Sequence, residues 1–256
     1  MMMNLCSLQS IGQDLYKVFQ SIGQDLYKVF IEGDRYKLFL NGLGVTLQLS
    51  IFGVMIGILG GLVLALMRLS RSRALNAISG MYTDIVRGTP MVVQLLIFYF
   101  VFFGGVREIN LFWIWTIDGA ALKIFVGALS FGCNSAAYVG EIIRAGIQSI
   151  DKGQTEAGRS LGLPYGATMR LIILPQAVKN VIPALGNELI ALVKETSIFG
   201  YIGGIDLTKV GEQIRAKTFI AIVPLLAVAA IYYVVVKLLT VLMRYIERRL
   251  RESDLR

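Results

Sequence analysis

The sequence predicts an all-α integral membrane protein, a single domain with five transmembrane helices. Of its 256 residues 55% are hydrophobic and only 16% are charged, whereas a soluble domain carries roughly 25% charged residues. The apolar residues are gathered in long uncharged runs, and a helix needs about 20 such residues to cross the ~30 Å hydrocarbon core of a bilayer. The composition therefore argues against a soluble globular protein, and against disorder, which requires few apolar residues and much charge.

The apolar runs give the expected spans in order along the chain. Residues 38–67 carry no charge at all, and similar runs follow. The fourth span is unusual, because it is apolar but contains Glu188, Lys194 and Glu195. Residues 111–115 are too short to cross, and their two tryptophans suit a membrane interface. We expect spans at about 38–67, 81–105, 121–146, 180–204 and 218–243.

The distribution of lysine and arginine predicts how these spans are oriented. Cytoplasmic loops carry an excess of both residues, and here the excess favours an extracytoplasmic N-terminus and a cytoplasmic C-terminus. Residues 149–178 then form a cytoplasmic loop, and residues 244–256 form a basic cytoplasmic tail. The net charge of +8 fits this topology better than it fits nucleic-acid binding.

The extracytoplasmic segment 1–37 contains an exact repeat. Residues 9–19 and 20–30 both read QSIGQDLYKVF. Eleven residues make about three helical turns, so both copies keep one apolar face, and an amphipathic helix on the membrane surface would fit. A tandem duplication without a dedicated role is the simpler explanation, because two units do not make a repeat architecture.

Glycines form a stripe in the first span. Gly53, Gly57 and Gly61 recur at four-residue spacing, which places them on one face of a helix. Small residues let two helix backbones approach closely in lipid, so we expect this stripe to pack against another helix.

The chain lacks the residues of most catalytic and metal sites. Histidine is absent, which removes the usual general base and metal ligand. Cys6 and Cys133 are the only cysteines and lie far apart, so no disulfide framework is indicated. No Gly-Lys dipeptide occurs, so there is no Walker A phosphate loop. We expect no catalytic residue, no metal and no cofactor on this chain, and any ATP with its magnesium would be bound by another subunit.

The predicted cytoplasmic loop carries the most specific motif. Its skeleton is Glu156-Ala157-Gly158, then Gly162, Ile172 and Leu174-Pro175. This resembles the EAA loop in the membrane subunits of bacterial ABC importers. Two further stretches resemble the polar amino-acid uptake branch of that family: Arg87-Gly88-Thr89-Pro90 followed by Val93-Gln94-Leu95, and the ten residues from Ala137 to Gly146. The resemblance covers about residues 38–250, and it implies a type I importer fold. Gly158, where many relatives have a second alanine, and the duplicated N-terminus depart from the family.

The physical properties of the loop agree with a docking role. Residues 156–161 can form a short amphipathic helix that Gly162 ends, and Pro164 suits the first turn of a second helix, which Pro175 would interrupt. Two such helices can dock into a groove on a partner. The resemblance identifies that partner as the ATP-binding subunit, and we call residues 149–178 the coupling loop. Its expected coupling residues are Glu156, Ala157, Gly158, Gly162, Leu163, Tyr165, Leu174 and Pro175.

Polar residues inside the spans are candidates for a substrate path. Charges at mid-bilayer are costly and are usually paired or line a wet cavity. A zwitterionic amino acid needs both signs of charge or matching hydroxyl and amide groups. The candidates are Gln94, Glu141, Lys194, Glu195, Thr196 and Ser197. Ion pairing that only fixes helix packing is the alternative, and we prefer it for Arg87, Glu141 and Arg144, of which Glu141 and Arg144 are three residues apart and can pair along one helix. The family-motif residues near the membrane boundary are Arg87, Gly88, Thr89, Pro90 and Arg144.

The sequence thus predicts a non-enzymatic permease subunit of an ATP-driven ABC importer for a polar amino acid, in the bacterial cytoplasmic membrane. The resemblance implies ATP-binding cassette subunits, an extracytoplasmic amino-acid-binding protein, and a second permease copy or paralogue as partners. The alternative is an ion-coupled secondary transporter or channel, with Lys194, Glu195, Glu141 and Arg144 as a relay. That scheme gives the coupling loop no role.

Overall fold

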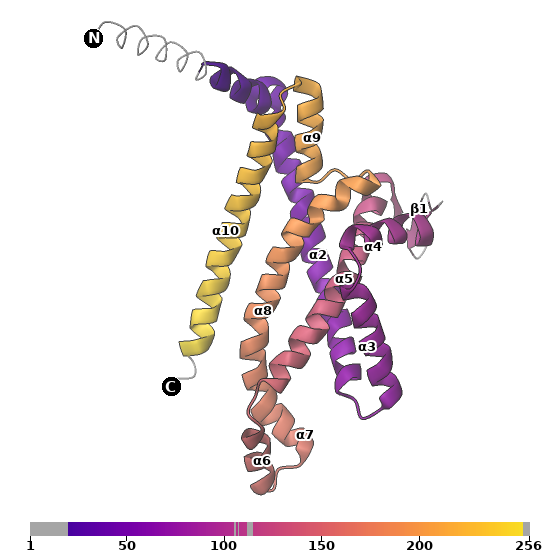
Figure 1. Cartoon of the computed structure of the whole chain (residues 1–256), viewed down its shortest axis with the longest axis vertical. Helices are drawn as coiled ribbons and strands as arrows, with labels where there is room; N and C mark the ends of the chain where they lie inside the picture. Colours follow the sequence, from indigo (N-terminus) through magenta and orange to yellow (C-terminus); the bar gives the residue numbers. More distant parts are fainter. Residues whose placement is uncertain (1–19, 105, 107, 112–114, 253–256) are drawn as a thin grey trace, which may run out of the picture.

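The computed structural model describes residues 20–104, 106, 108–111 and 115–252. These residues form a bundle of long helices with a small hairpin at one side (Figure 1). The elements after the N-terminal helical residues 20–26 are η1 (Tyr27–Ile31), η2 (Glu32–Asp34), α2 (Arg35–Leu69), α3 (Arg73–Arg87), α4 (Met91–Ile97), η3 (Phe98–Phe102), β1 (Glu108–Leu111), β2 (Trp115–Asp118), α5 (Gly119–Gln148), α6 (Lys152–Ser160), α7 (Tyr165–Thr168), η4 (Met169–Ile173), α8 (Leu174–Glu195), η5 (Thr196–Ile202), α9 (Leu207–Thr218) and α10 (Ile222–Glu252).

Three helices of the described chain are long and apolar enough to cross a membrane. They are Gln20–Leu69, Gly119–Gln148 and Ile222–Leu250. The first two contain the first and third predicted spans, and the last begins four residues after the predicted start of the fifth span, 218–243. A fourth arises if α3 and the helix Met91–Phe102 are counted as one bent span. The fourth predicted span, 180–204, falls on α8 and η5. Helix α8 is not among the three, because its charged residues make it less apolar, although it packs along α5 and α10. The count of five spans therefore stays a prediction.

The second predicted span, 81–105, is not one straight helix. The chain bends by 106° between α3 and the helix Met91–Phe102. Gly88 and Pro90 lie at the bend, and proline disfavours a helical conformation in the residue before it. The sequence therefore places the apolar run correctly, but not the corner inside it.

The segment between α4 and α5 contains a structure that the all-α prediction missed. Strands β1 and β2 pair antiparallel, with Glu108 opposite Asp118 and Leu111 opposite Trp115. The prediction that residues 111–115 are too short to cross agrees with this hairpin.

The glycine stripe of the first span packs against α5, as predicted. A Cβ atom added to Gly57 would lie 2.6 Å from Ser135 Oγ, and one added to Gly61 would lie 2.6 Å from Val139 Cγ1. Gly53 meets Phe131 in the same way at 3.2 Å. The contacts advance by four residues on both helices, so α2 and α5 run parallel with their backbones in close contact.

The second copy of the N-terminal repeat is helical and bends into α2 at Gly33 and Asp34, both of which have positive φ. Of its predicted apolar face, Val29 is fully buried in a cluster with α9 and α10, whereas Ile22 and Leu26 are exposed. The first copy lies outside the described residues. The face is thus only half used for packing within this chain.

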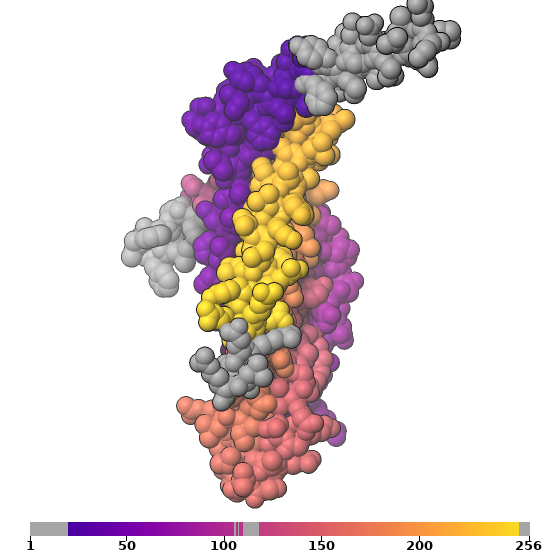
Figure 2. Space-filling view, turned by 90° about the vertical axis from the view of Figure 1, so that its left-hand side faces the viewer, coloured from indigo at the N-terminus to yellow at the C-terminus, as the bar shows by residue number. Residues whose placement is uncertain are grey.

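The coupling loop projects beyond the bundle at the end opposite the N-terminal helix (Figure 1). Figure 2 shows α10 running along one face of the molecule, with the coupling loop as a separate lobe below it. Helix α9 lies at the other end, where α2 begins, and packs against α2 and α10. The coupling loop and α9 therefore lie at opposite ends of the bundle.

We expect Gly57→Ala to destabilise the protein by about 1–3 kcal/mol, the usual cost of overpacking. The new methyl group would collide with both Oγ and Cβ of Ser135, which leave it no room. The measurement is the thermal unfolding midpoint of the purified protein in detergent. Gly44→Ala is the matched control on the same helix, because no atom lies within 4 Å of its added Cβ. Equal midpoints for the two variants would contradict the close contact of α2 with α5.

Candidate functional site: the coupling loop and the polar groups of the bundle

The first helix of the coupling loop begins four residues earlier than the sequence predicts. We expected residues 156–161, and α6 spans Lys152–Ser160. Asp151 explains the difference, because its carboxylate accepts a hydrogen bond from the backbone N–H of Gly153 at 2.6 Å and so caps the helix.

Gly162 ends α6, as predicted. Its φ is +83°, and its N–H donates to Arg159 O at 3.0 Å. The next N–H, of Leu163, donates to Gly158 O at 3.1 Å. This pair of bonds is a Schellman motif, which satisfies the last carbonyls of a helix and reverses the chain. Pro164 then directly precedes α7.

Gly158, the departure from the family pattern, is the buried residue of α6. A Cβ atom there would lie 2.8 Å from Thr168 Cγ2 and 3.0 Å from Ile172 Cδ1. The two short helices therefore press directly against each other, and the lobe is a packed unit. Its other predicted residues Glu156, Ala157, Tyr165, Leu174 and Pro175 are exposed, and Leu163 is half-buried.

Pro175 does not interrupt the second helix, contrary to the prediction. The chain stays helical through α7, η4 and α8, but η4 is a π-turn in which Leu174 N–H reaches back to Met169 O. Proline has no N–H, so the carbonyl four residues before it loses its α-helical partner. One extra residue in the turn accommodates this loss, as in other π-bulges.

A hydrogen bond joins the two chain segments where the lobe meets the bundle. Asn180 Nδ2 on α8 donates to Ser149 Oγ, at the end of α5, at 3.0 Å. Leu161 and Leu171 are 83% and 63% exposed. The lobe thus combines a fixed base with apolar side chains that no described part of this chain covers.

The Arg87-Gly88-Thr89-Pro90 motif forms the corner between α3 and α4, and Gln94 fastens it. Gln94 Nε2 donates to Val86 O at 2.7 Å and to Thr89 Oγ1 at 2.8 Å. Its Oε1 accepts from Asn134 Nδ2 of α5 at 3.0 Å. Both ends of the Gln94 amide are therefore used within the protein, which favours the packing role over the substrate path for this residue.

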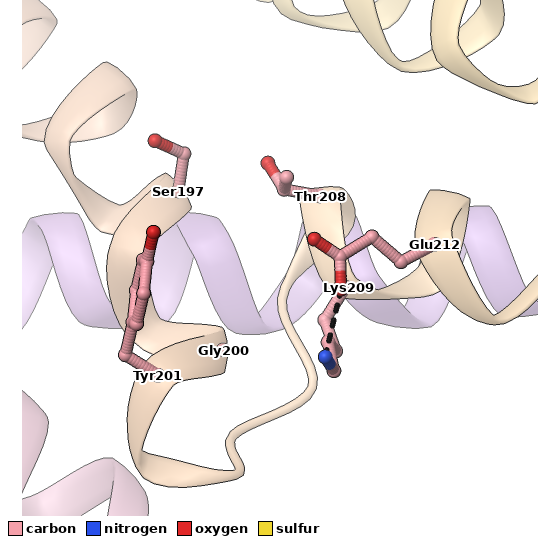
Figure 3. Close-up of a pocket in the computed structure, with 6 residues that line it drawn as sticks. All are labelled: Ser197, Gly200, Tyr201, Thr208, Lys209 and Glu212. Carbon is pink, nitrogen blue, oxygen red and sulfur yellow. Dashed lines mark hydrogen bonds and ion pairs between the residues drawn. The ribbon is translucent and has the colours of Figure 1, made fainter.

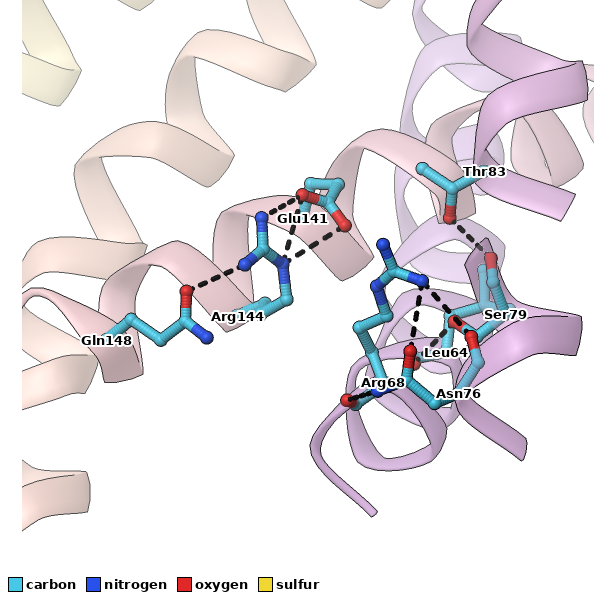
Figure 4. A network of polar contacts seen from close by, with 8 residues as sticks. All are labelled: Leu64, Arg68, Asn76, Ser79, Thr83, Glu141, Arg144 and Gln148. Atoms are coloured by element: carbon cyan, nitrogen blue, oxygen red, sulfur yellow. Dashed lines mark hydrogen bonds and ion pairs between the residues drawn. The ribbon is translucent and has the colours of Figure 1, made fainter. Parts of the chain in front are cut away.

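The guanidinium groups of Arg144 and Arg68 lie near the carboxylate of Glu141 of α5, and Arg144 binds it (Figure 4). Glu141 and Arg144 pair along the helix as predicted, with 2.5 Å between Glu141 Oε2 and Arg144 Nη2. Arg87 of α3 lies over the ring of Tyr138 of α5, 5.1 Å from its centroid, and Arg68 of α2 donates to Asn76 of α3 at 3.2 Å. This arrangement joins α2, α3 and α5, so it favours the alternative that these charges fix helix packing.

The four polar residues at the end of α8 are placed differently from one another. Lys194 is exposed, and it makes no hydrogen bond or ion pair with any residue that the structure describes. Glu195 and Ser197 are half-buried. Thr196 is fully buried and bonds its own helix through Val193 O at 2.8 Å. Lys194, Glu195 and Ser197 therefore stay candidates for the substrate path. The hydroxyl of Thr196 is buried and already donates a hydrogen bond within the protein, which disfavours a role in that path.

One interior contact was missed by the sequence analysis. Glu188 of α8 accepts a hydrogen bond from Ser135 Oγ of α5 at 2.8 Å. Ser135 also faces Gly57 of α2, so three helices meet at this point. The only signal in the sequence was a carboxylate in an apolar run, which does not name its partner.

The fold and the lobe define the class of protein. The chain belongs to the family of binding-protein-dependent transport system inner membrane components, which it matches over residues 53–252. It is thus a multi-pass inner-membrane protein of an ABC transporter. This family supports the permease over the alternative of a secondary transporter or channel.

Relatives that are similar to this chain over most of its length are named as amino-acid transport proteins. The arginine transport system permease protein ArtQ of Bacillus subtilis is 42% identical over 84% of this chain and 93% of its own length. The glutamine transport system permease protein GlnP of Escherichia coli is 34% identical over 84% of this chain and 93% of its own. A crystal structure of an amino acid ABC transporter with histidines superposes with a TM-score of 0.75 at 40% identity, over 86% of this chain and 98% of that one. The inward-facing MetNI methionine transporter, at 22% identity and a TM-score of 0.65, shares the fold.

We expect Gln94→Met to destabilise the protein by about 1–3 kcal/mol, because it leaves the buried amide of Asn134 without its acceptor. Thermal unfolding in detergent measures the loss, with Gln154→Met as the control, since Gln154 is exposed on α6. If Gln94→Met unfolds like the unchanged protein but no longer transports, Gln94 belongs to the path after all.

Proposed function

We propose that this chain is the pore-forming permease subunit of an ATP-driven importer that moves a polar amino acid across the bacterial cytoplasmic membrane. The observation that carries the proposal is the packed lobe of α6 and α7, which projects from the bundle with exposed apolar side chains. Relatives named for arginine and glutamine support a polar amino acid as cargo. The chain itself performs no catalysis.

The partners follow from this role. Two ATP-binding cassette subunits would bind ATP and magnesium and dock on the lobe, and an extracytoplasmic binding protein would deliver the amino acid. A second copy of this chain, or a paralogue, would complete the pore. The exposed Leu161, Tyr165 and Leu171 provide the apolar anchors that a docking groove requires.

The lobe is built to pass on a displacement. Closure of the ATP-binding subunits would move α6, which bears directly on Thr168 and Ile172 through Gly158. These residues continue without a break into α8. A shift of the lobe would therefore reach α8, which ends at Glu195 and is followed by Ser197 in η5, and would alternate access to the path.

We expect Gly162→Val to leave the protein folded and inserted, but to abolish amino-acid uptake and the stimulation of ATP hydrolysis by loaded binding protein. No atom lies within 4 Å of the added Cβ, so the effect comes from the backbone alone: φ is +83°, which a β-branched residue strongly disfavours. The measurement is ATPase activity of the complete complex in proteoliposomes, with and without loaded binding protein.

Gly166→Val is the matched control for this experiment. Gly166 also has open space around its added Cβ, but its φ is not positive and it lies in α7, four residues away. It should keep substantial stimulated hydrolysis. Normal stimulation in Gly162→Val would remove the coupling role from this loop.

The proposed orientation is tested by thiol labelling of intact cells. In a background without Cys6 and Cys133, a cysteine replacing Glu32 should react with a membrane-impermeant reagent, and one replacing Arg73 should not. The two residues flank α2, the first span, so they must lie on opposite sides of the membrane. The reverse labelling pattern contradicts an extracytoplasmic N-terminus.

A further inference from the structure

The N-terminal helical segment, residues 20–31, turns away from the axis of α2 instead of extending it (Figure 1). Together with α2 it forms a stretch of 50 residues, Gln20–Leu69, which would be about 75 Å long if it were straight. The hydrocarbon core of a bilayer is only ~30 Å thick, so part of this stretch has to lie outside the core. Gly33 and Asp34, with φ of +64° and +55°, turn the chain at the junction.

This corner is held by a hydrogen bond and an ion pair. The guanidinium group of Arg35 donates to the carbonyl oxygen of Lys28 across the turn, and Lys37 Nζ lies 2.7 Å from Asp34 Oδ2. Positive φ is uncommon outside glycine, but aspartate is among the residues enriched there, so Asp34 suits its place. The direction in which the N-terminal helical segment leaves α2 is therefore set by the fold.

The N-terminal helical segment lies at the level where two helices enter their uncharged runs. Lys37 is the last charged residue before the uncharged run of α2, and Lys217 is the last one before the run that leads into α10. Val29 of the segment is buried in the same cluster that Val223, in the first turn of α10, packs against. Since uncharged runs of this length cross the hydrocarbon core, the segment lies at the boundary of the membrane.

The neighbouring helix α9 indicates the same level. Its apolar residues contribute to the cluster around Val29, whereas its polar residues Thr208, Lys209 and Glu212 line an open pocket (Figure 3). Lys209 Nζ and Glu212 Oε2 lie 2.7 Å apart, and their side chains are 36% and 52% exposed. Charges exposed to hydrocarbon are costly, so this end of the bundle lies among lipid headgroups and water.

The N-terminal helical segment is amphipathic, and the bundle covers only part of its apolar face. Ile22, Leu26 and Val29 recur at i, i+4 and i+7, so they share one face. Val29 is fully buried, whereas Ile22 and Leu26 are each 45% exposed, because the first turns of the segment extend beyond the bundle (Figure 1). The opposite face carries three exposed polar residues: Ser21, Gln24 and Lys28.

The direction of Val29 shows which way this apolar face points. Val29 packs in the cluster with α9 and α10, so the face is directed toward the bundle and the membrane that the bundle spans. Ile22 and Leu26 share that face and therefore point to the same side, beside α10. The first turns of α10 expose apolar side chains of their own, Ile222 and Leu225, which are 68% and 62% exposed. Apolar residues of a spanning helix that no protein covers face lipid.

We propose that the N-terminal helical segment lies in the surface of the lipid bilayer, with Ile22 and Leu26 inserted among the lipid chains beside α10. Its polar face meets the headgroups and water. Helices of this kind bury their apolar face about 5–10 Å into the boundary between headgroups and acyl chains. The segment thereby anchors the start of α2 and, through Val29, the cluster with α9 and α10 at one depth in the membrane. The inference requires only that the chain spans a membrane, and it depends neither on the cargo nor on the side on which the N-terminus lies.

Spin labels measure this depth directly. In a cysteine-free background, single cysteines replace Ile22, Leu26, Ser21 or Gln24 and carry a nitroxide in the complete transporter, in nanodiscs of phosphatidylethanolamine and phosphatidylglycerol. Power saturation compares the accessibility of each label to oxygen, which concentrates in lipid, with its accessibility to a water-soluble nickel chelate. Labels at Ile22 and Leu26 should lie about 5–10 Å below the lipid phosphates, and labels at Ser21 and Gln24 at or above them.

Two further labels calibrate the measurement. A label at Val234, which is 54% exposed on α10, should lie deep in lipid, and a label at Gln154, which is exposed on α6, should lie in water.

A double substitution tests whether the apolar side chains hold the segment in place. With the label at Tyr27, which is 60% exposed, Ile22→Asn combined with Leu26→Asn should raise accessibility to the nickel chelate toward the value measured on α6. Ser21→Asn combined with Gln24→Asn is the matched control, and it should leave the label unchanged because both residues already lie on the polar face.

Three results overturn the proposal. One is equal depth of the labels at Ile22 and Gln24, and another is an unchanged label at Tyr27 after the double substitution to asparagine. The third is a loss of accessibility at Ile22 and Leu26 when loaded binding protein is added, which would show that this face binds a protein and not lipid. All three leave the proposed function intact, since uptake is measured separately.

Discussion

The contact between α2 and α5 is the constraint on which the rest of the molecule depends. Gly57 and Gly61 bring the backbones of these helices together over Ser135 and Val139. In lipid the hydrophobic effect does not drive helices together, so such close packing has to supply the attraction. Helix α5 then positions Glu188 of α8 through Ser135, Gln94 of α4 through Asn134, and the start of the coupling loop.

Several polar side chains in this bundle hold its corners together. Gln94 and Thr89 close the bend after α3, and Arg68 and Asn76 bond each other across the turn from α2 to α3. Backbone groups freed at a bend need partners where water is scarce, and these side chains provide them. Other polar groups bridge helices, as Ser135 and Glu188 do, and Glu195 lies half-buried at the end of α8. The position of a polar residue in the bundle, and not its type alone, therefore decides its role.

Sequence reasoning succeeded where one physical signal dominates. The uncharged runs located α2, α5 and α10, four-residue spacing located the glycine contact, and Gly162 was the one glycine in the coupling loop placed to end its first helix. It failed where two signals compete. The run 81–105 is apolar enough for one span, but Gly88 and Pro90 turn it by 106°. Pro175 was expected to interrupt a helix, and a π-turn absorbed it. Partners such as Ser135 for Glu188 depend on the helix arrangement, which no local pattern contains.

The N-terminal repeat has a consequence at the level of the gene. Val29 and Phe30 of the second copy pack into the cluster that joins α2, α9 and α10. Because residues 9–19 and 20–30 are identical, removing either copy yields the same polypeptide, and the residues that fill this cluster are still directly joined to α2. The loss of eleven residues from this region would therefore keep Val29 and Phe30, or their identical counterparts, at the same distance from α2 along the chain. A chain shortened or lengthened by one copy would keep the same eleven residues directly before Ile31 and α2.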